Sequence, residues 1–237
     1  MPPEAGSGRR TSRRGRLSRD LVLGTALALA DREGLPALSM RRLAAELGVE
    51  AMALYRYAPG KDALLDGLVE RVFTEVVDAL EAAPPGAGDW RDELHGTVRE
   101  LYRGSLRHPR VVPLFATRML TVPLARRPRP VLRVQERVLG SLARAGLDAD
   151  RTQVAYRAVS AWALGHTLME LNAVVDDPGE PEAAIRLGLQ RMPVRELPRL
   201  RATVPALAEP GGEELLATGL DALLDRFLGG PGREAMR

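Results

Sequence analysis

Apolar residues recur every three or four positions along most of the 237-residue chain, and this spacing predicts amphipathic helices. No segment of the sequence alternates apolar and polar residues with period two for long enough to predict a sheet. We therefore expect an all-α fold. The expected helices lie at residues 18–33, 39–47, 61–81, 89–107, 110–121, 131–145, 150–175 and 213–228, with short helices also after Val49 and after residue 182. Proline- or glycine-rich segments with little periodicity lie at residues 82–88, 122–130, 176–182 and 192–212.

Residues suited to helix ends mark several of these boundaries. Ser18, Ser39, Asp89 and Asp150 are expected N-caps, because their side-chain oxygens can accept hydrogen bonds from the free amides of a first helical turn. Gly34 follows the first expected helix and is predicted to end it.

Residues 39–61 have the pattern of a helix-turn-helix. Two short apolar-faced segments flank Gly48, which can adopt the positive φ that ends one helix and turns the chain into the next. In such a unit the second helix enters the major groove of DNA. The segment therefore predicts a DNA-binding unit.

Positive charge is concentrated at the N-terminal end of the chain. Residues 1–61 hold eleven basic and six acidic residues, a net charge of +5, whereas the whole chain carries +3. A polyanion such as double-stranded DNA would meet this end first. The same charge also fits a solubilising tail, and charge alone does not decide between the two.

The composition indicates a soluble cytoplasmic protein. The chain has no cysteine, which excludes disulfides and thiolate chemistry and fits a reducing compartment. No uninterrupted apolar run reaches the length of a membrane span, and the N-terminus lacks the apolar block of a signal peptide. We expect no membrane partner, no cofactor and no metal site.

Three regions are expected along the chain. Residues 1–17 form a flexible basic arm, which either contacts DNA or stays disordered. Residues 18–62 form the helix-turn-helix domain, which is too small to be very stable alone. Residues 63–237 form a larger helical domain, joined to the first by a helix that begins at Lys61.

Leu43 to Leu68 resembles the TetR family of bacterial transcriptional regulators, in which a Leu-Gly-Val turn precedes an Ala-Leu-Tyr recognition helix and a lysine opens the fourth helix. Leu47, Gly48, Val49, Leu54, Tyr55, Lys61 and Leu64 fall at the family's spacing. Trp90, Ala116 to Arg118 and the stretch 162–170 are similar to the ligand-binding domain of the tetracycline repressor subgroup. Three positions depart from the common pattern: Glu50, Tyr57 and Ala58.

The resemblance and the helix-turn-helix geometry together imply the residues that contact DNA. Arg41 can present its planar guanidinium to a guanine edge, whereas Tyr57 keeps a hydroxyl that can reach a phosphate. Phosphate contacts fix orientation and base contacts carry specificity. The expected DNA-contacting residues are Ser39, Arg41, Glu50, Ala51, Met52, Ala53, Tyr55, Arg56, Tyr57 and Lys61. Arg42 is expected on a solvated face.

The resemblance also implies a small-molecule site in the C-terminal domain, with mostly apolar walls and a few polar groups. Its expected lining is Val77, Thr97, Leu101, Leu114, Phe115, Arg118, Met119, Gln135, Leu139, Trp162 and His166. Each of these residues also fits ordinary core packing, which is the alternative for every position. His166 suits a hydrogen-bonding or core role better than a metal-binding one.

Three departures argue against a magnesium-tetracycline site. The resemblance assigns the metal-binding imidazole of the tetracycline repressor to the position of Leu114, and two further polar groups to Val77 and Thr97. Without those groups a hard-cation site cannot be assembled there. We expect a different, largely apolar effector.

Taken together, the sequence predicts a ligand-responsive transcriptional repressor that binds a palindromic operator as a homodimer. Apolar faces on the last two long helices are the candidate dimer contacts, namely Val154, Ala158, Ala161, Gly165, Leu168, Leu216, Leu220, Leu223 and Phe227. The alternative is a constitutive DNA-binding protein whose C-terminal domain only dimerises. The three scattered histidines and the lack of any catalytic motif in the sequence do not support an enzyme.

Overall fold

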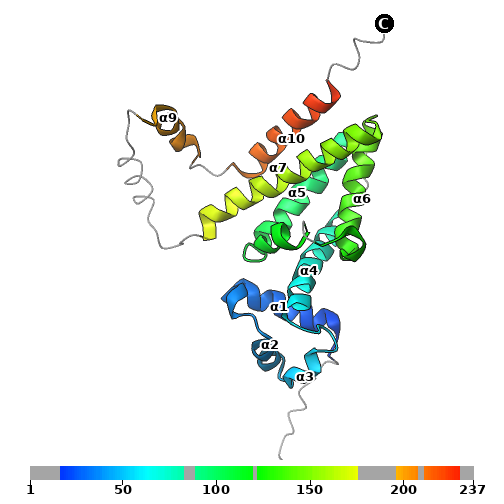
Figure 1. Cartoon of the computed structure of the whole chain (residues 1–237), viewed down its shortest axis with the longest axis vertical. Helices are drawn as coiled ribbons and strands as arrows, with labels where there is room; N and C mark the ends of the chain where they lie inside the picture. Colours follow the sequence, from blue (N-terminus) through cyan, green and yellow to red (C-terminus); the bar gives the residue numbers. More distant parts are fainter. Residues whose placement is uncertain (1–16, 83–88, 120–121, 176–195, 208–210, 230–237) are drawn as a thin grey trace, which may run out of the picture.

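The computed structural model describes residues 17–82, 89–119, 122–175, 196–207 and 211–229, and within them it contains helices and turns but no strand. The main helices are α1 (Arg19–Glu33), α2 (Met40–Leu47), α3 (Ala51–Leu54), α4 (Lys61–Ala82), α5 (Trp90–Arg107), α6 (Arg129–Arg144), α7 (Ala149–Val175), α9 (Pro198–Leu207) and α10 (Gly212–Leu228). Short helical turns lie at Leu35–Ala37, Phe115–Met119 and Leu124–Arg126. The all-α prediction is confirmed (Figure 1).

The predicted helix ends in the N-terminal unit are confirmed. Ser18 accepts a hydrogen bond from the amide of Leu21 at 3.1 Å, and Ser39 accepts one from the amide of Arg42 at 3.1 Å. Gly34 ends α1 with φ 84°, and Gly48 ends α2 in the left-handed conformation with φ 65°. Asp89 caps α5 through the amides of residues 91 and 92.

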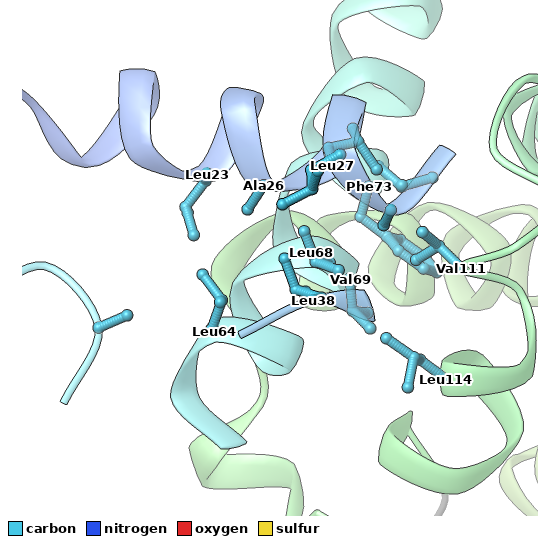
Figure 2. Close-up of a cluster of buried hydrophobic side chains, with 14 of the residues drawn as sticks. Leu23, Ala26, Leu27, Leu38, Leu64, Leu68, Val69, Phe73, Val111 and Leu114 are labelled. Atoms are coloured by element: carbon cyan, nitrogen blue, oxygen red, sulfur yellow. The ribbon is translucent and has the colours of Figure 1, made fainter. Parts of the chain in front are cut away.

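One apolar core joins the helix-turn-helix to the rest of the molecule. Buried side chains of α1 pack on one face of α4, whose 22 residues run without a break from the helix-turn-helix into the larger part of the chain. Figure 2 shows Leu27 of α1, Leu68 and Phe73 of α4, and Val111 as members of the same buried cluster. The N-terminal unit is therefore stabilised by contacts outside itself, as its small size predicts.

A second core lies among α5, α6, α7 and α10, at the end of the molecule away from α2 and α3 (Figure 1). Its fully buried side chains include Leu94, Leu142, Val159 and Leu220. α7 and α10 pack alongside each other over this core.

Several predicted boundaries were wrong. α6 begins at Arg129 rather than Val131, because Pro130 is compatible with a first helical turn, where its missing amide is not needed. The N-cap of α7 is Asp148 rather than Asp150, since Asp148 accepts from the amide of Arg151 at 2.8 Å.

Two other segments also differ from the sequence prediction. Of the predicted helix 110–121, the described residues 110–112 form turns, and the helical conformation starts only at Pro113 and continues into a π-helical turn at Phe115–Met119. The segment 192–212, which has little helical periodicity, contains α9. Residues 1–16 of the predicted arm and the predicted loop and short helix between 176 and 195 lie outside the described residues.

Candidate DNA-binding surface and effector core

α2, α3 and the first turn of α4 lie together at one end of the molecule (Figure 1). The structure brings all ten predicted DNA-contacting residues to this end. Eight of them are exposed, and Ala51 and Tyr57 are half-buried. Met52 in α3 is 78% exposed, so an apolar side chain stands in water on the helix expected to enter the groove.

Four of these residues, the acidic Glu50 among them, carry polar side chains without a partner among the described residues. The side chains of Arg41, Tyr55 and Lys61 make no hydrogen bond or ion pair with any residue that the structure describes. Their cationic or hydroxyl groups are therefore available to phosphates and base edges. Ser39 differs, because its hydroxyl oxygen already caps α2.

Arg42 is more than a solvated side chain. Its guanidinium donates to both oxygens of Glu33 at 2.6 and 3.3 Å and to Glu46 at 2.8 Å, and Arg32 donates to Glu46 at 2.9 Å. The hydrogen bond from Arg42 lowers the pKa of Glu46. This cluster ties the last turn of α1 to α2, and the Arg42 side chain stays 37% exposed, as a solvated face predicts.

Tyr57 is engaged within the protein. Its hydroxyl donates to the carbonyl oxygen of Leu17 at 2.6 Å and accepts from Arg56 at 2.6 Å, and the Arg56 guanidinium lies 4.8 Å from the ring centre. The hydroxyl hydrogen that a phosphate would need is thus donated to Leu17. Its contact with DNA stays a prediction, and its observed role is to hold the start of α1.

The predicted effector-lining residues fall in different parts of the core. Val77, Leu114 and Phe115 are buried in the core that includes α1 and α4, and half-buried Leu101 packs against it. The ring of Phe115 meets that of Phe73 edge-on at 5.3 Å. Leu139 is half-buried on α6, and the side chain of Met119 lies outside the described residues.

Trp162 and His166 form a separate group on α7. The indole nitrogen of Trp162 donates to the carbonyl oxygen of Leu216 at 3.0 Å, and Nε2 of His166 lies 2.9 Å from the carbonyl oxygen of Gly212. The His166 ring also lies 5.5 Å from that of Tyr102. His166 is therefore a hydrogen-bonded core residue in this structure, one of the two roles that its sequence context predicts.

Sequence reasoning missed two polar residues beside this group. Glu170 accepts from the amide of Gly211 at 2.6 Å, and the hydroxyl of Tyr102 lies 3.4 Å from the same carboxylate. Burial raises the pKa of Tyr102. Helical spacing places Glu170 one turn after His166 on α7, and that was the available signal.

The polar members Thr97, Gln135 and Arg118 of the predicted lining are engaged to different degrees. Thr97 donates to the carbonyl oxygen of Glu93 at 2.8 Å, whereas Oε1 of Gln135 is buried without a partner among the described residues. Arg118 donates to Asp62 at 2.7 Å and to Asp66 at 3.0 Å. The hydrogen bond with Asp62 raises the pKa of Arg118.

Two surface pockets adjoin these groups. One of about 50 Å³ lies beside Asp66, Arg118 and Val131, and one of about 210 Å³ lies between α5 and α10 beside His95 and Leu220. Only Arg118 belongs to the predicted lining, so that lining stays a prediction. No cluster of three or more His, Asp or Glu side chains in the described ranges is placed to hold a metal ion. No described helix is long and apolar enough to cross a membrane.

The sequence matches two protein families in succession. Residues 22–68 match "Bacterial regulatory proteins, tetR family", and residues 83–226 match "Tetracyclin repressor-like, C-terminal domain". The protein belongs to the TetR family. This assignment places the chain among transcriptional regulators rather than enzymes.

Individual relatives agree with the family assignment. The transcriptional repressor DrrR1 of Streptomyces coeruleorubidus is 42% identical over 50% of this chain, and the tetracycline repressor class C of Escherichia coli is 29% identical over 88% of it. The alignments span 44% of DrrR1 and 90% of the class C repressor. The chain therefore spans less than half of DrrR1. Among solved structures, the Streptomyces coelicolor TetR family protein ActR in complex with actinorhodin is 27% identical with a TM-score of 0.73, covering 92% of this chain and 100% of that one.

Membership in the TetR family does not supply the metal-binding groups that the predicted effector lining lacks. Leu114 and Val77 are buried apolar residues, and the Thr97 hydroxyl is donated to its own helix. These three positions offer no imidazole or carboxylate to a hard cation.

Proposed function

We propose that this TetR-family protein is a repressor that binds a palindromic operator as a homodimer and is released by a small-molecule effector. The observation that carries the proposal is the group of exposed, unengaged side chains on the helix-turn-helix, above all Arg41, Tyr55 and Lys61. Rigid helices hold these side chains at one end of the chain, as DNA docking requires.

The path from the effector core to this surface runs through α4. Lys61 is its first residue, and Val77 lies near its other end. Arg118, on the π-helical turn beside the core, holds Asp62 and Asp66 in the first turns of the same helix. A ligand that repositions residues 115–119 would thus move the residues next to Lys61. For a complete switch the ligand must prefer the released state by about 5.5 kcal/mol.

The exposed face of α7 supports a homodimer. Val154 is 55% and Met169 is 71% exposed, and Ala161 between them is also exposed. Leu216 and Leu220 of α10, in contrast, are buried in the chain's own core, whereas exposed Leu215 and half-buried Leu223 and Phe227 can offer apolar contacts. We assign the dimer contact to α7 and the outer face of α10.

The effector is proposed to be a largely apolar small molecule, because the predicted lining is mostly apolar. ActR, a relative in fold and sequence, has been solved with actinorhodin and with (S)-DNPA. Both complexes support a small organic molecule as the class of ligand. The alternative, a constitutive DNA-binding protein, predicts that no small molecule changes operator affinity.

Selection of bound fragments from a random DNA pool, followed by gel-shift titration at several salt concentrations, tests the DNA part of the proposal. Lys61→Ala together with Tyr55→Phe should weaken binding to every DNA sequence. The slope of log affinity against log salt concentration should also become shallower, by about 1 for the loss of the lysine. Arg41→Ala should relax preference at particular base pairs, by about 1–3 kcal/mol each. Unchanged affinity and selectivity in both variants would refute the docking surface.

A further inference from the structure

His108, at the end of α5, connects three parts of the structure. Its Nδ1 lies 2.8 Å from Oδ2 of Asp31 in the last turn of α1, and its Nε2 lies 2.9 Å from Oε2 of Glu75 in α4. The His108 side chain is only 14% exposed. The ring therefore bridges the helix-turn-helix unit and the long helix that connects it to the effector core.

The two contacts specify a protonation state. Ionised carboxylates only accept hydrogen bonds, and a neutral imidazole has a single N–H. Both contacts are satisfied at once only when His108 is an imidazolium that donates from both nitrogens to Asp31 and Glu75. Loss of one proton would leave a ring lone pair facing a carboxylate oxygen, which removes one bond and adds repulsion.

Other charged groups around the ring do not replace this contact. From α4, Arg71 lies 3.3 Å from the second oxygen of Glu75 and donates to Asp20. The second oxygen of Asp31 is buried without a partner among the described residues. His108 is thus the partner of the half-buried Asp31 carboxylate among the described residues.

Basic residues next to His108 in sequence are directed elsewhere. Arg110, two residues beyond it, donates to the carbonyl oxygen of Arg32 at 2.9 Å, and Arg107 pairs with Glu100 on α5 itself. Arg110 therefore adds a second link between this turn and the end of α1, without contacting either carboxylate.

The bridge continues to the DNA-binding helices. Directly after Asp31, Arg32 and Glu33 pair with Glu46 and Arg42 of α2. Arg42 is the neighbour of Arg41, the expected base-reading residue. Hydrogen bonds and ion pairs, joined through the backbone at residues 31–33 and 41–42, thus lead from His108 to the DNA-binding surface.

We propose that His108 is a proton-dependent positioning residue, whose imidazolium holds α1 against α4 and thereby fixes the helix-turn-helix in the orientation that binds the operator. Its deprotonation loosens α1, so that less of the protein is in the binding orientation and operator affinity falls. The inference concerns the regulation of the proposed operator binding and rests on it for that consequence, whereas the clamp on α1 can be measured without DNA.

The first measurement follows amide hydrogen exchange in α1 at pH 6 and pH 8.5, corrected for intrinsic rates. In the wild-type protein the protection of the last turn of α1 against exchange should fall at least about fivefold at the higher pH. Fivefold is the lower end of the range in which one site typically changes the equilibrium at another. His108→Gln should show the lower protection at both pH values. Equal protection of wild type and variant at each pH would overturn the inference, whatever the DNA results.

The second measurement is operator affinity over the same pH range, with a non-operator duplex to correct for general effects of pH on DNA binding. Wild-type affinity should fall at least about fivefold towards pH 8.5, and His108→Gln should flatten the profile. His95→Gln is the matched control, since His95 also faces a carboxylate, that of Asp221 at 2.9 Å, but does so between α5 and α10. A control variant that loses the pH dependence in place of His108→Gln would overturn the assignment to His108.

Asp31→Asn tests the partner. It keeps the shape of the side chain, and its amide can donate to a ring nitrogen as well as accept from one, so the two contacts no longer require the imidazolium and the pH profile should flatten too. If no DNA fragment binds at any pH, the proposed function is refuted. The hydrogen-exchange experiment would still decide whether His108 holds α1 against α4. Far-UV circular dichroism and thermal unfolding of every variant separate loss of the clamp from loss of the fold.

Discussion

The indole ring of Trp162 in α7 lies directly over the backbone of Gly219 in α10. A Cβ atom at residue 219 would lie 2.1 Å from the nearest ring carbon, which no relaxed contact permits. The same indole donates to the carbonyl oxygen of Leu216 one turn earlier. α7 and α10 can therefore pack at this distance only with glycine at position 219.

Gly219→Ala should lower the free energy of unfolding by about 1–3 kcal/mol, because the rigid indole must shift and lose its hydrogen bond. For a protein of this size the melting temperature should fall by about 2–4 °C per kcal/mol. Gly96→Ala in α5 is the control, since a Cβ there meets nothing within 4 Å. Equal melting temperatures for the two variants would contradict the close packing.

Tyr57→Phe and Tyr55→Phe should have opposite consequences. The Tyr57 hydroxyl is bonded to Leu17, so its removal should cost about 0.5–1.5 kcal/mol of stability. The Tyr55 hydroxyl has no partner among the described residues, so its removal should leave stability within about 0.5 kcal/mol and weaken DNA binding instead. Urea titration together with gel shifts would separate the two effects, and a stability loss in Tyr55→Phe alone would reverse the assignment.

Glu213 makes a contribution to the free energy of unfolding that is lost at acid pH. Arg103 donates to both of its oxygens at 2.6 and 2.8 Å, and this hydrogen bonding lowers the pKa of Glu213. A carboxylate with a lowered pKa contributes stability above its unfolded pKa of about 4.3, and that contribution disappears as the pH falls through the folded value. Because the pair is exposed, the effect should be small.

Thermal unfolding of Glu213→Gln and wild type between pH 7 and pH 3 measures this contribution. The difference in melting temperature should be present at pH 7 and should vanish at the acid end. A difference that stays constant over the whole range would mean that the side chain acts through packing rather than charge.

Magnesium-tetracycline should not bind tightly. Leu114 and Val77 are buried and apolar, and the Thr97 hydroxyl already has an acceptor, so none of the three can hold the metal. Calorimetric titration with tetracycline, with and without magnesium, should give no strong magnesium-dependent heat. Tight binding that requires the metal would show that the chelate is held by other residues.

Ala161→Asp should weaken the homodimer. The residue is exposed in the middle of the apolar face of α7, and a charge there would be buried in the proposed interface without a partner. Light scattering after size-exclusion chromatography should detect monomer, and operator affinity should fall with it. Ala143→Asp on the exposed side of α6 should leave the assembly unchanged, and dimers in both variants would place the interface elsewhere.

Sequence reasoning succeeded where the cause is local. Ser18, Ser39 and Asp89 cap helices through amides two or three residues away, so the chain within one turn contains the whole signal. The two acidic residues Asp148 and Asp150 are equally good caps in isolation, and the placement of the first turn of α7 decides between them. Periodicity likewise predicts that α4 is long and amphipathic.

Contacts between distant segments could not be predicted in this way. His108 meets Asp31 across 77 residues and Glu75 across 33, and nothing in the local pattern pairs them. Tyr57 was expected to face DNA because its place in the motif suggests a phosphate contact, yet its partner Leu17 lies 40 residues away. The effector core is harder still, because apolar residues at helical spacing look alike whether they fill a core or line a site.

The single core shared by α1, α4 and residues 111–115 limits how this protein can be rebuilt as a biosensor. A chimera that exchanges residues 18–62 for the helix-turn-helix domain of another regulator would replace Leu23, Leu27 and Leu38. It would keep the surfaces against which these three side chains pack. Such a hybrid should fold well only if Val111 and Leu114 are exchanged together with the helix-turn-helix domain. The unit that can be transplanted is therefore defined by packing and is discontinuous in the sequence.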